Sequence, residues 1–96
     1  MVGKYQYIVF CELNDDGNKL PEAGWKNLFA NEDKLAKKQQ VEIMFRGTPY
    51  GVSESYVTVY STDKPVDELM KMIMETGREK YVRAARTVIV SPLIFS

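Results

Sequence analysis

Four stretches of the chain have the residue pattern of β-strands. They cover residues 4–13, 41–46, 53–61 and 82–90. The third stretch, SESYVTVYS, predicts a strand most clearly, because β-branched and aromatic residues occur at every second position. In the first stretch, KYQYIVFCEL, both alternating sets of side chains contain apolar members. A strand of this kind is expected to be covered on both of its faces.

Two helices are predicted between these strands. The first spans about 20–38, because apolar residues recur at helical spacing after Pro21; they are Trp25, Leu28, Phe29, Leu35 and Ala36. It follows a turn cluster at 14–19, and we expect Trp25 to anchor the core. The second begins at 62–65, with Thr62 or Asp63 as the N-cap, and is expected to end at Gly77. Its buried side is expected to contain Val66, Leu69, Met70 and Ile73, and the Met70, Met72 and Met74 cluster is expected to pack in the core.

The order strand, helix, strand, strand, helix, strand predicts a ferredoxin-like α+β domain that spans residues 1–96. We expect a four-stranded antiparallel sheet with both helices on one face. The crossovers are expected to make the first and third strands parallel neighbours at the centre of the sheet. Pro92 interrupts the last strand and is followed by a short apolar tail at 93–96.

Two helices on one face leave the second face of the sheet uncovered. That face also carries apolar side chains, and an exposed apolar surface of this size favours association. We therefore predict that two copies pair their sheets face to face, so that the homodimer forms an α/β barrel. The apolar tail at 93–96 is expected to reach into the partner.

Composition excludes several kinds of chemistry. The chain has 13 basic and 13 acidic residues and no histidine. Without histidine, a Ser-His-Asp or Cys-His arrangement is impossible, and one cysteine does not make a zinc site. Cys11 is expected to be a buried structural thiol in a reducing compartment, which predicts a cytoplasmic location. We expect no cofactor, no metal and no membrane partner, and the balanced charge argues against nucleic acid.

The run YVTVYSTDKPVDELMKMI, followed by VRAARTVIV, resembles the dimeric α+β barrel superfamily. It is most similar to the small ligand-sensing domains of the leucine-responsive regulator family and to stand-alone GYD-type domains. The turn before the third strand departs from those families, because GVSESY stands there. The resemblance implies a dimer whose small effector binds near such a turn at the subunit interface.

The loop FRGTPYGVSES, residues 45–55, is the candidate ligand site. Its candidate residues are Arg46, Thr48, Tyr50, Ser53, Glu54 and Ser55. The planar guanidinium of Arg46 suits a small anionic ligand, Tyr50 would cover it, and the serines would donate hydrogen bonds. The alternative is a long hairpin connection with ordinary turn chemistry. The basic run REKYVRAAR, residues 78–86, is interpreted as a solvated face, with an anion or nucleic-acid contact as its alternative.

Two other function classes stay open at this point. A cofactor-independent enzyme, of the monooxygenase or isomerase type that the resemblance includes, would place Arg46, Tyr50 and Glu54 around one pocket. Glu12 and Glu42 are further carboxylates on predicted strands, and burial would raise the pKa of such groups. An RNA-binding domain has the same order of elements and displays aromatic side chains on its central strands. The leading interpretation is a non-catalytic homodimer that binds a small molecule or a protein.

Overall fold

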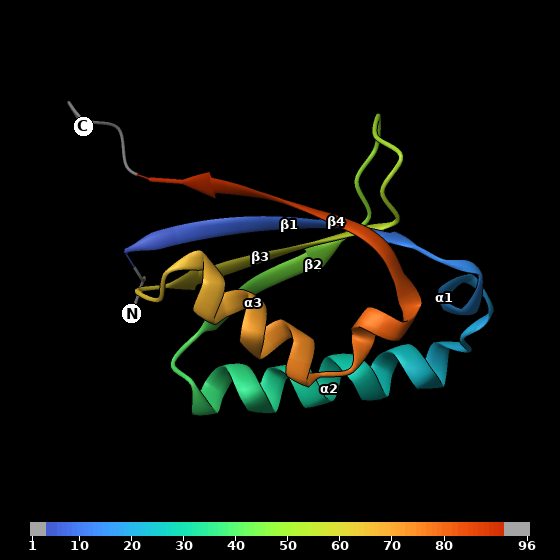
Figure 1. The fold of residues 1–96 in the computed structure, drawn as a ribbon, viewed down its shortest axis with the longest axis horizontal. Coiled ribbons are helices and arrows are strands. Elements are labelled where there is room, and N and C mark those ends of the chain that lie inside the picture. The colour runs from blue at the N-terminus through green and yellow to red at the C-terminus, as the bar shows by residue number, and fades with distance from the viewer. Residues whose placement is uncertain (1–3, 92–96) are drawn as a thin grey trace.

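The structure, a computed structural model, describes residues 4–91 (Figure 1). Within this range the elements follow one another in a fixed order: β1 (Tyr5–Leu13), α1 (Asp15–Lys19), α2 (Glu22–Lys38), β2 (Glu42–Gly47), β3 (Tyr56–Thr62), α3 (Val66–Glu75), the 3-10 helix η1 (Arg78–Tyr81) and β4 (Val82–Val90). The predicted ferredoxin-like α+β fold is confirmed. Pro92 and the apolar tail at 93–96 lie outside the described residues.

The four strands form one sheet in the order β2-β3-β1-β4, and all neighbours are antiparallel. The prediction that the first and third strands run parallel is therefore wrong. Each helical crossover joins two parallel strands, β1 to β2 and β3 to β4, but leaves a gap of one strand between them. A strand of the other unit fills that gap in the antiparallel direction.

The predicted turn at 14–19 is instead the short helix α1. Asn14 caps it, since its side-chain oxygen accepts a hydrogen bond from the backbone N–H of Gly17 at 2.8 Å. Gly17 is required by close packing, because a Cβ atom there would lie 2.2 Å from the carbonyl oxygen of Tyr81. The chain then turns at Leu20, and α2 begins at Glu22 with Pro21 as its N-cap.

The start of α3 differs from its prediction, whereas its end agrees. The N-cap is Pro65, and neither Thr62 nor Asp63 caps the helix. Instead Asp63 Oδ1 accepts a hydrogen bond from the backbone N–H of Lys4 at 2.7 Å, which ties the loop to the N-terminal end of β1. After α3, Gly77 has a φ of 79°, a left-handed conformation that glycine adopts without a steric penalty.

The core lies between the sheet and the helices. Its sheet side consists of Tyr7, Val9 and Cys11 of β1 and Tyr60 of β3, and its helix side includes Ala36, Leu69, Met72 and Ile73. Cys11 is buried, as predicted. The predictions that Val66 and Met74 are buried are wrong, because they are 36% and 56% exposed; of the three methionines in α3, only Met72 is fully buried. Trp25 stacks against Phe29, Tyr56 and Tyr81, with ring centroids 5.6 to 6.0 Å apart.

Both long helices lie on the same side of the sheet (Figure 1). The loop between β2 and β3 projects from the sheet in the opposite direction, away from the helices. The face of the sheet turned away from α2 and α3 is called the open face below.

Candidate functional site

The open face carries a row of apolar side chains that crosses all four strands. The antiparallel register places Val59 of β3 opposite both Phe45 of β2 and Ile8 of β1, and Ile8 opposite Val88 of β4. Phe45 is 58% exposed and Val88 40% exposed, which is far more than a side chain in a strand core retains. A continuous, partly exposed apolar row of this kind is typical of interaction surfaces.

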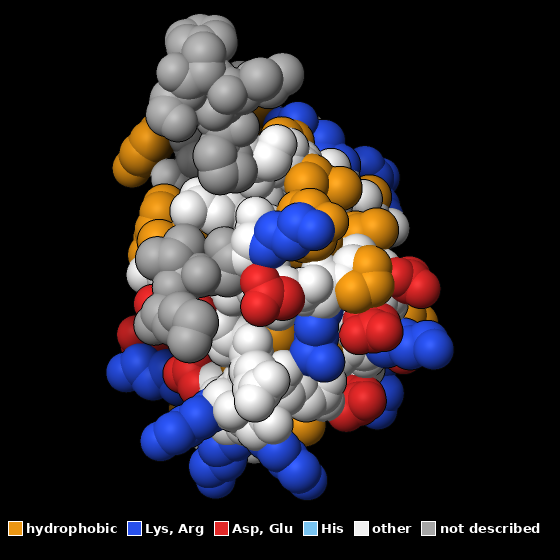
Figure 2. Space-filling model, turned by 90° about the vertical axis from the view of Figure 1, so that its left-hand side faces the viewer, with side chains coloured by type: hydrophobic (Ala, Val, Ile, Leu, Met, Phe, Trp, Pro, Cys, Tyr) orange, Lys and Arg blue, Asp and Glu red, His pale blue; other side chains and the backbone are white. Residues whose placement is uncertain are grey.

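More apolar side chains flank this row. Phe10 lies opposite Val57 on β3, and Val90 lies at the far end of β4. In the end-on view of Figure 2, hydrophobic side chains show mostly in the upper half, beside the sheet, and charged side chains mostly in the lower half, where the helices lie.

Two pairs of opposite charges lie on the open face, and a fifth charge, the exposed Glu42 opposite Ser61, has no ion pair among the described residues. Arg83 pairs with Glu12, and Arg86 donates a hydrogen bond through Nε to Glu54. The Arg86 guanidinium also lies over the ring of Phe10, at 4.2 Å from its centroid. This pairing with Arg86 lowers the pKa of the Glu54 carboxyl. Four of these charges are thus neutralised within the chain, and Glu42 leaves the face slightly acidic, which does not favour an anionic ligand.

The predicted ligand-site residues do not converge on one point. Arg46 faces the helices, whereas Glu54 pairs with Arg86 on the open face. The other four, Thr48, Tyr50, Ser53 and Ser55, lie on the projecting loop, and Tyr50 is 92% exposed. The backbone N–H of Ser55 donates to the carbonyl of Cys11 at 2.8 Å, which fixes the base of the loop to β1. The structure thus does not place Arg46, Tyr50 and Glu54 around one pocket.

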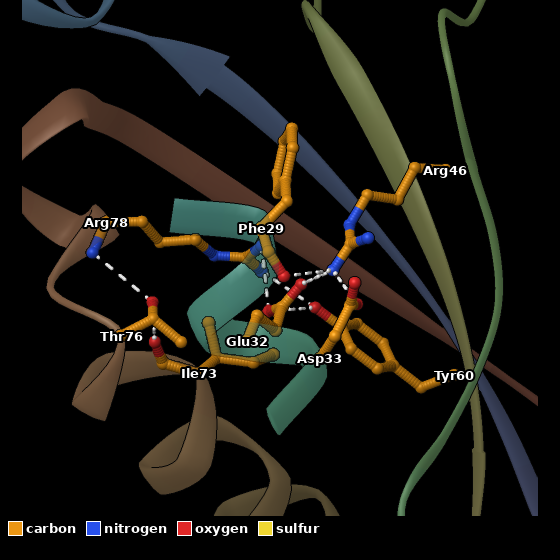
Figure 3. A network of polar contacts seen from close by, with 8 residues as sticks. All are labelled: Phe29, Glu32, Asp33, Arg46, Tyr60, Ile73, Thr76 and Arg78. Carbon is orange, nitrogen blue, oxygen red and sulfur yellow. Dashed lines mark hydrogen bonds and ion pairs between the residues drawn. The ribbon is translucent and has the colours of Figure 1, made fainter. Parts of the chain in front are cut away.

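Glu32 forms the centre of a buried ionic network that the sequence patterns did not reveal (Figure 3). It is fully buried in α2, and its carboxylate accepts hydrogen bonds from Arg46 Nη2 at 2.7 Å and from the hydroxyl of Tyr60 at 2.7 Å. Arg78 Nη1 lies 3.0 Å from the same carboxylate. One signal was present in the sequence: Glu32 lies three residues after Phe29 and four before Ala36, on the apolar side of its helix.

The network connects four elements through one carboxylate. Arg46 comes from β2, Tyr60 from β3 and Arg78 from η1, and Arg46 also pairs with Asp33 at 2.9 Å. Burial raises the pKa of Tyr60, so its hydroxyl stays a neutral donor to Glu32 while it accepts from Arg78 Nη2 at 3.0 Å. A carboxylate held by three donors is not available as a general base, and we interpret the network as structural.

One further expectation about charged residues is wrong. The run 78–86 is not wholly a solvated face, because Arg78 is buried beneath it. The burial that the enzyme alternative requires of the strand carboxylates is not found either: Glu42 is exposed, and Glu12 and Glu54 are partly exposed and paired with arginines. These findings remove the observations on which the enzyme interpretation depended.

The aromatic side chains that suggested RNA binding lie on the wrong side of the sheet for it. Tyr7 and Tyr60 face the helices in the core, and the Tyr7 hydroxyl donates to the carbonyl of Lys64 at 2.8 Å. Base stacking needs rings that are open to solvent. Tyr7 and Tyr60 therefore cannot supply a stacking platform.

Comparison with solved structures identifies the fold. The chain superposes on a chlorite dismutase-like protein with a TM-score of 0.71 at 11% identity, covering 97% of this chain but only 45% of that one. A dimeric protein of unknown function with a ferredoxin-like fold, from Bacteroides fragilis, gives a TM-score of 0.52 at 14% identity, and the match covers 92% of this chain and 95% of that one. An uncharacterised NIPSNAP domain protein from Burkholderia xenovorans superposes with a TM-score of 0.59 at 10% identity, and the match covers 96% of this chain and 97% of that one.

These likenesses show the ferredoxin-like α+β fold that the sequence predicted. No protein-family model and no curated protein matches the chain. Among residues 4–91, no helix is both long and apolar enough to cross a membrane. Over the same residues, no three potential metal ligands of the His, Cys, Asp or Glu type come together.

Proposed function

We propose that this protein is a non-catalytic interaction module that forms a homodimer through its open face. The observation that carries the proposal is the apolar row Phe45, Val59, Ile8 and Val88, which crosses the whole sheet without a helix above it. Packing two such rows against each other removes both from water, which is the main driving force of association.

A second copy fits this face better than an unrelated charged partner does. The charges on Glu12, Arg83, Glu54 and Arg86 are paired within each chain, so they do not repel a second copy. Glu42, exposed at the start of the edge strand β2, adds one negative charge to each face. The whole chain is also neutral, with 13 basic and 13 acidic residues. A nucleic acid would require a basic surface, which this face lacks.

The size of the face supports a modest but stable dimer. The pairing of β1 with β3 covers seven residues. Four strands of that length, spaced ~4.8 Å apart with ~3.3 Å per residue, make a flat area of roughly 450 Å². The side chains that project from the sheet make the real surface larger than this flat area. The loop between β2 and β3 enlarges it further, with Tyr50 at 92% and Val52 at 43% exposure. The flat area alone is a little more than half of the roughly 800 Å² that each partner buries in a standard interface, so we expect a modest dimer.

The likeness to a ferredoxin-like protein described as dimeric supports the same proposal. A reducing location also fits, because Cys11 is a free, buried thiol, and on that ground we infer that the protein works in the cytoplasm. Within the predicted ligand site at 45–55, Tyr50 is accessible, but Arg46 is already bound to Glu32 and Glu54 to Arg86, so we do not propose an anion site there.

A matched pair of substitutions tests the dimer. Val88 on the open face and Val66 at the start of α3 have similar exposure, 40% and 36%. Val88→Lys should shift the protein to the monomer in sedimentation velocity, because it places a charge in the apolar row, directly opposite Ile8. Val66→Lys should leave the dimer intact, since it lies on the helix side. Equal sedimentation of both variants and the wild type would refute the proposed interface.

A further inference from the structure

β4 forms one edge of the sheet, and its outer side is open. The order β2-β3-β1-β4 places β1 on one side of this strand, and within residues 4–91 no strand lies on its other side. Every second backbone N–H and C=O group of β4 therefore points away from the sheet. An open edge of this kind is a template on which another extended chain can pair.

The opposite edge of the sheet is less suited to such pairing. β2 has six residues, and its register with β3 shifts between Ile43 and Phe45, which indicates a bulge. Short length and bulges both protect an edge from further pairing. β4 has nine residues, and its register with β1 is regular over the seven residues from Ala84 to Val90. β4 is therefore the edge that can accept a further strand.

The helix-facing side of β4 is only partly covered. Ile89 lies opposite Tyr7 and therefore faces the helix side, yet its side chain is 54% exposed. Ala85 lies opposite the buried Cys11 and is also exposed. Because α3 does not reach across the whole strand, a strip of β4 beside this helix is open to solvent.

α3 borders this strip with apolar side chains of its own. Val66, Met70 and Met74 follow one another at intervals of four residues, which places them along one side of the helix. Met74 is 56% exposed. Met70 and Met74 also line a hollow of about 260 Å³, together with Val82 and Ala85 of β4. The strip of β4 and this side of α3 form an apolar groove, which is called the β4 groove below.

One exposed carboxylate lines the hollow without an ion pair. Glu79 is exposed, and no basic residue within residues 4–91 forms an ion pair with it. Arg78, the other charged residue of the lining, is buried and already paired with Glu32. Lys71 and Lys80 are exposed as well, but neither lines the hollow. A segment that enters the β4 groove is therefore best matched by a basic group beside Glu79.

The arginines of β4 do not oppose such a segment. Arg83 and Arg86 point to the open face, and they are paired with Glu12 and Glu54. A basic residue that faces the groove lies on the opposite side of the strand from both of them.

We propose that β4 binds an extended segment of a partner protein as a fifth, antiparallel strand, with apolar side chains in the β4 groove and one basic residue beside Glu79. Backbone hydrogen bonds to the open edge hold the segment, and its groove-facing side chains cover Ile89, Met70 and Met74. Because Glu79 directly precedes the start of β4, the basic residue comes at the C-terminal end of the antiparallel segment. The site uses the outer edge and the helix side of the sheet, so it is separate from the open face.

Titration with the peptide VTVSVQK, blocked at both ends, tests the proposal. Its valines and its lysine occupy alternate positions, so their side chains share one face of a strand. Nuclear magnetic resonance follows the exchange of the β4 amides with solvent. At saturation, exchange should slow at least tenfold at every second amide between Ala84 and Val90, and change little at the amides that already pair with β1. Binding without this alternation, or no binding at millimolar peptide, would overturn the proposal.

Two matched changes test the basic end of the segment. The peptide VTVSVQE should bind at least fivefold more weakly than VTVSVQK. Glu79→Gln should weaken the binding of VTVSVQK at least threefold, whereas Glu75→Gln should have almost no effect, because Glu75 accepts a hydrogen bond from Gln39 of α2 and so faces away from β4. Equal binding of the two peptides, or equal effects of the two substitutions, would refute a basic partner.

A variant of the open face separates this inference from the dimer. Val59→Lys places a charge in the apolar row on β3, and it should give a monomer that binds VTVSVQK like the wild type. Should this variant still self-associate and protect every second β4 amide without peptide, a second copy occupies the edge, and the proposed partner is wrong.

Discussion

Replacing Glu32 by glutamine should be among the most destabilising conservative substitutions in this chain. The change keeps the shape of the side chain but removes the one negative charge that faces Arg78 and Arg46 inside the protein. Arg78 has a side-chain exposure of 3% and keeps its charge at any accessible pH, so it would remain buried without a counter-ion. Breaking one partner of a buried ion pair costs about 3–5 kcal/mol.

Asp33→Asn is the matched control. Asp33 is the next residue in α2 and pairs with the same Arg46, at 2.9 Å, but its side chain is 57% exposed. Exposed pairs contribute about 0–1 kcal/mol, because water replaces the lost partner. The two variants make the same chemical change, acid to amide, beside the same arginine, and differ in the burial of the carboxylate and in the further contacts of Glu32 with Arg78 and Tyr60.

Urea unfolding followed by far-ultraviolet circular dichroism measures the difference. The protein concentration must be held fixed, because dimerisation adds to the apparent stability. With a urea dependence of about 1.5 kcal/mol per molar, Glu32→Gln should lower the midpoint by about 2 M or more. Asp33→Asn should lower it by less than about 0.7 M. Should Glu32→Gln cost no more than Asp33→Asn, the buried network does not hold the four elements together.

Three other substitutions test separate parts of the structure by the same unfolding assay. Gly77→Val should lower the free energy of unfolding by about 1–2 kcal/mol because φ is 79° there, and the cause is not a clash, since no atom lies within 4 Å of the position that a Cβ would take. Gly77→Asn should lower it less, and an equal loss in both variants would contradict a backbone cause. Arg46→Ala should cost about 1.5–3 kcal/mol, since Glu32 loses a charge-assisted hydrogen bond, and a cost below about 0.5 kcal/mol would show that Arg46 is not part of the network. Burial raises the pKa of Cys11 above that of the unfolded chain, so stability should fall as pH rises from about 8.5 toward 10 by up to ~1.4 kcal/mol per pH unit, and Cys11→Ala should lack this slope in that window.

The sequence predicted the elements well because their signals are local. The last strand was predicted at 82–90 and observed at Val82–Val90, and the glycine that ends α3 was identified correctly. Alternation of apolar residues also indicated a sheet with two apolar faces, one of which lies open. Neither signal depends on contacts between distant residues, so neither needs knowledge of the fold.

The predictions that were wrong concern side chains whose partners are distant in the sequence. Asp63 has the residue type of a helix cap, but its side chain instead accepts from the backbone of Lys4, 59 positions away. The predicted ligand site assumed that Arg46 and Glu54 share a side of the sheet. Their partners, Glu32 in α2 and Arg86 in β4, lie on opposite sides, and no pattern within the loop carries that information.

The most direct test of the dimer is an isotope-filtered nuclear Overhauser experiment on an equal mixture of ¹³C-labelled and unlabelled chains. It detects contacts between copies and identifies which side chains make them. We expect intermolecular cross-peaks at the methyl groups of Ile8, Val59 and Val88 on the open face, and none at Leu69, which is fully buried on the helix side. Cross-peaks confined to the helices, or none at a protein concentration well above that needed for a standard dimer, would contradict the proposed homodimer.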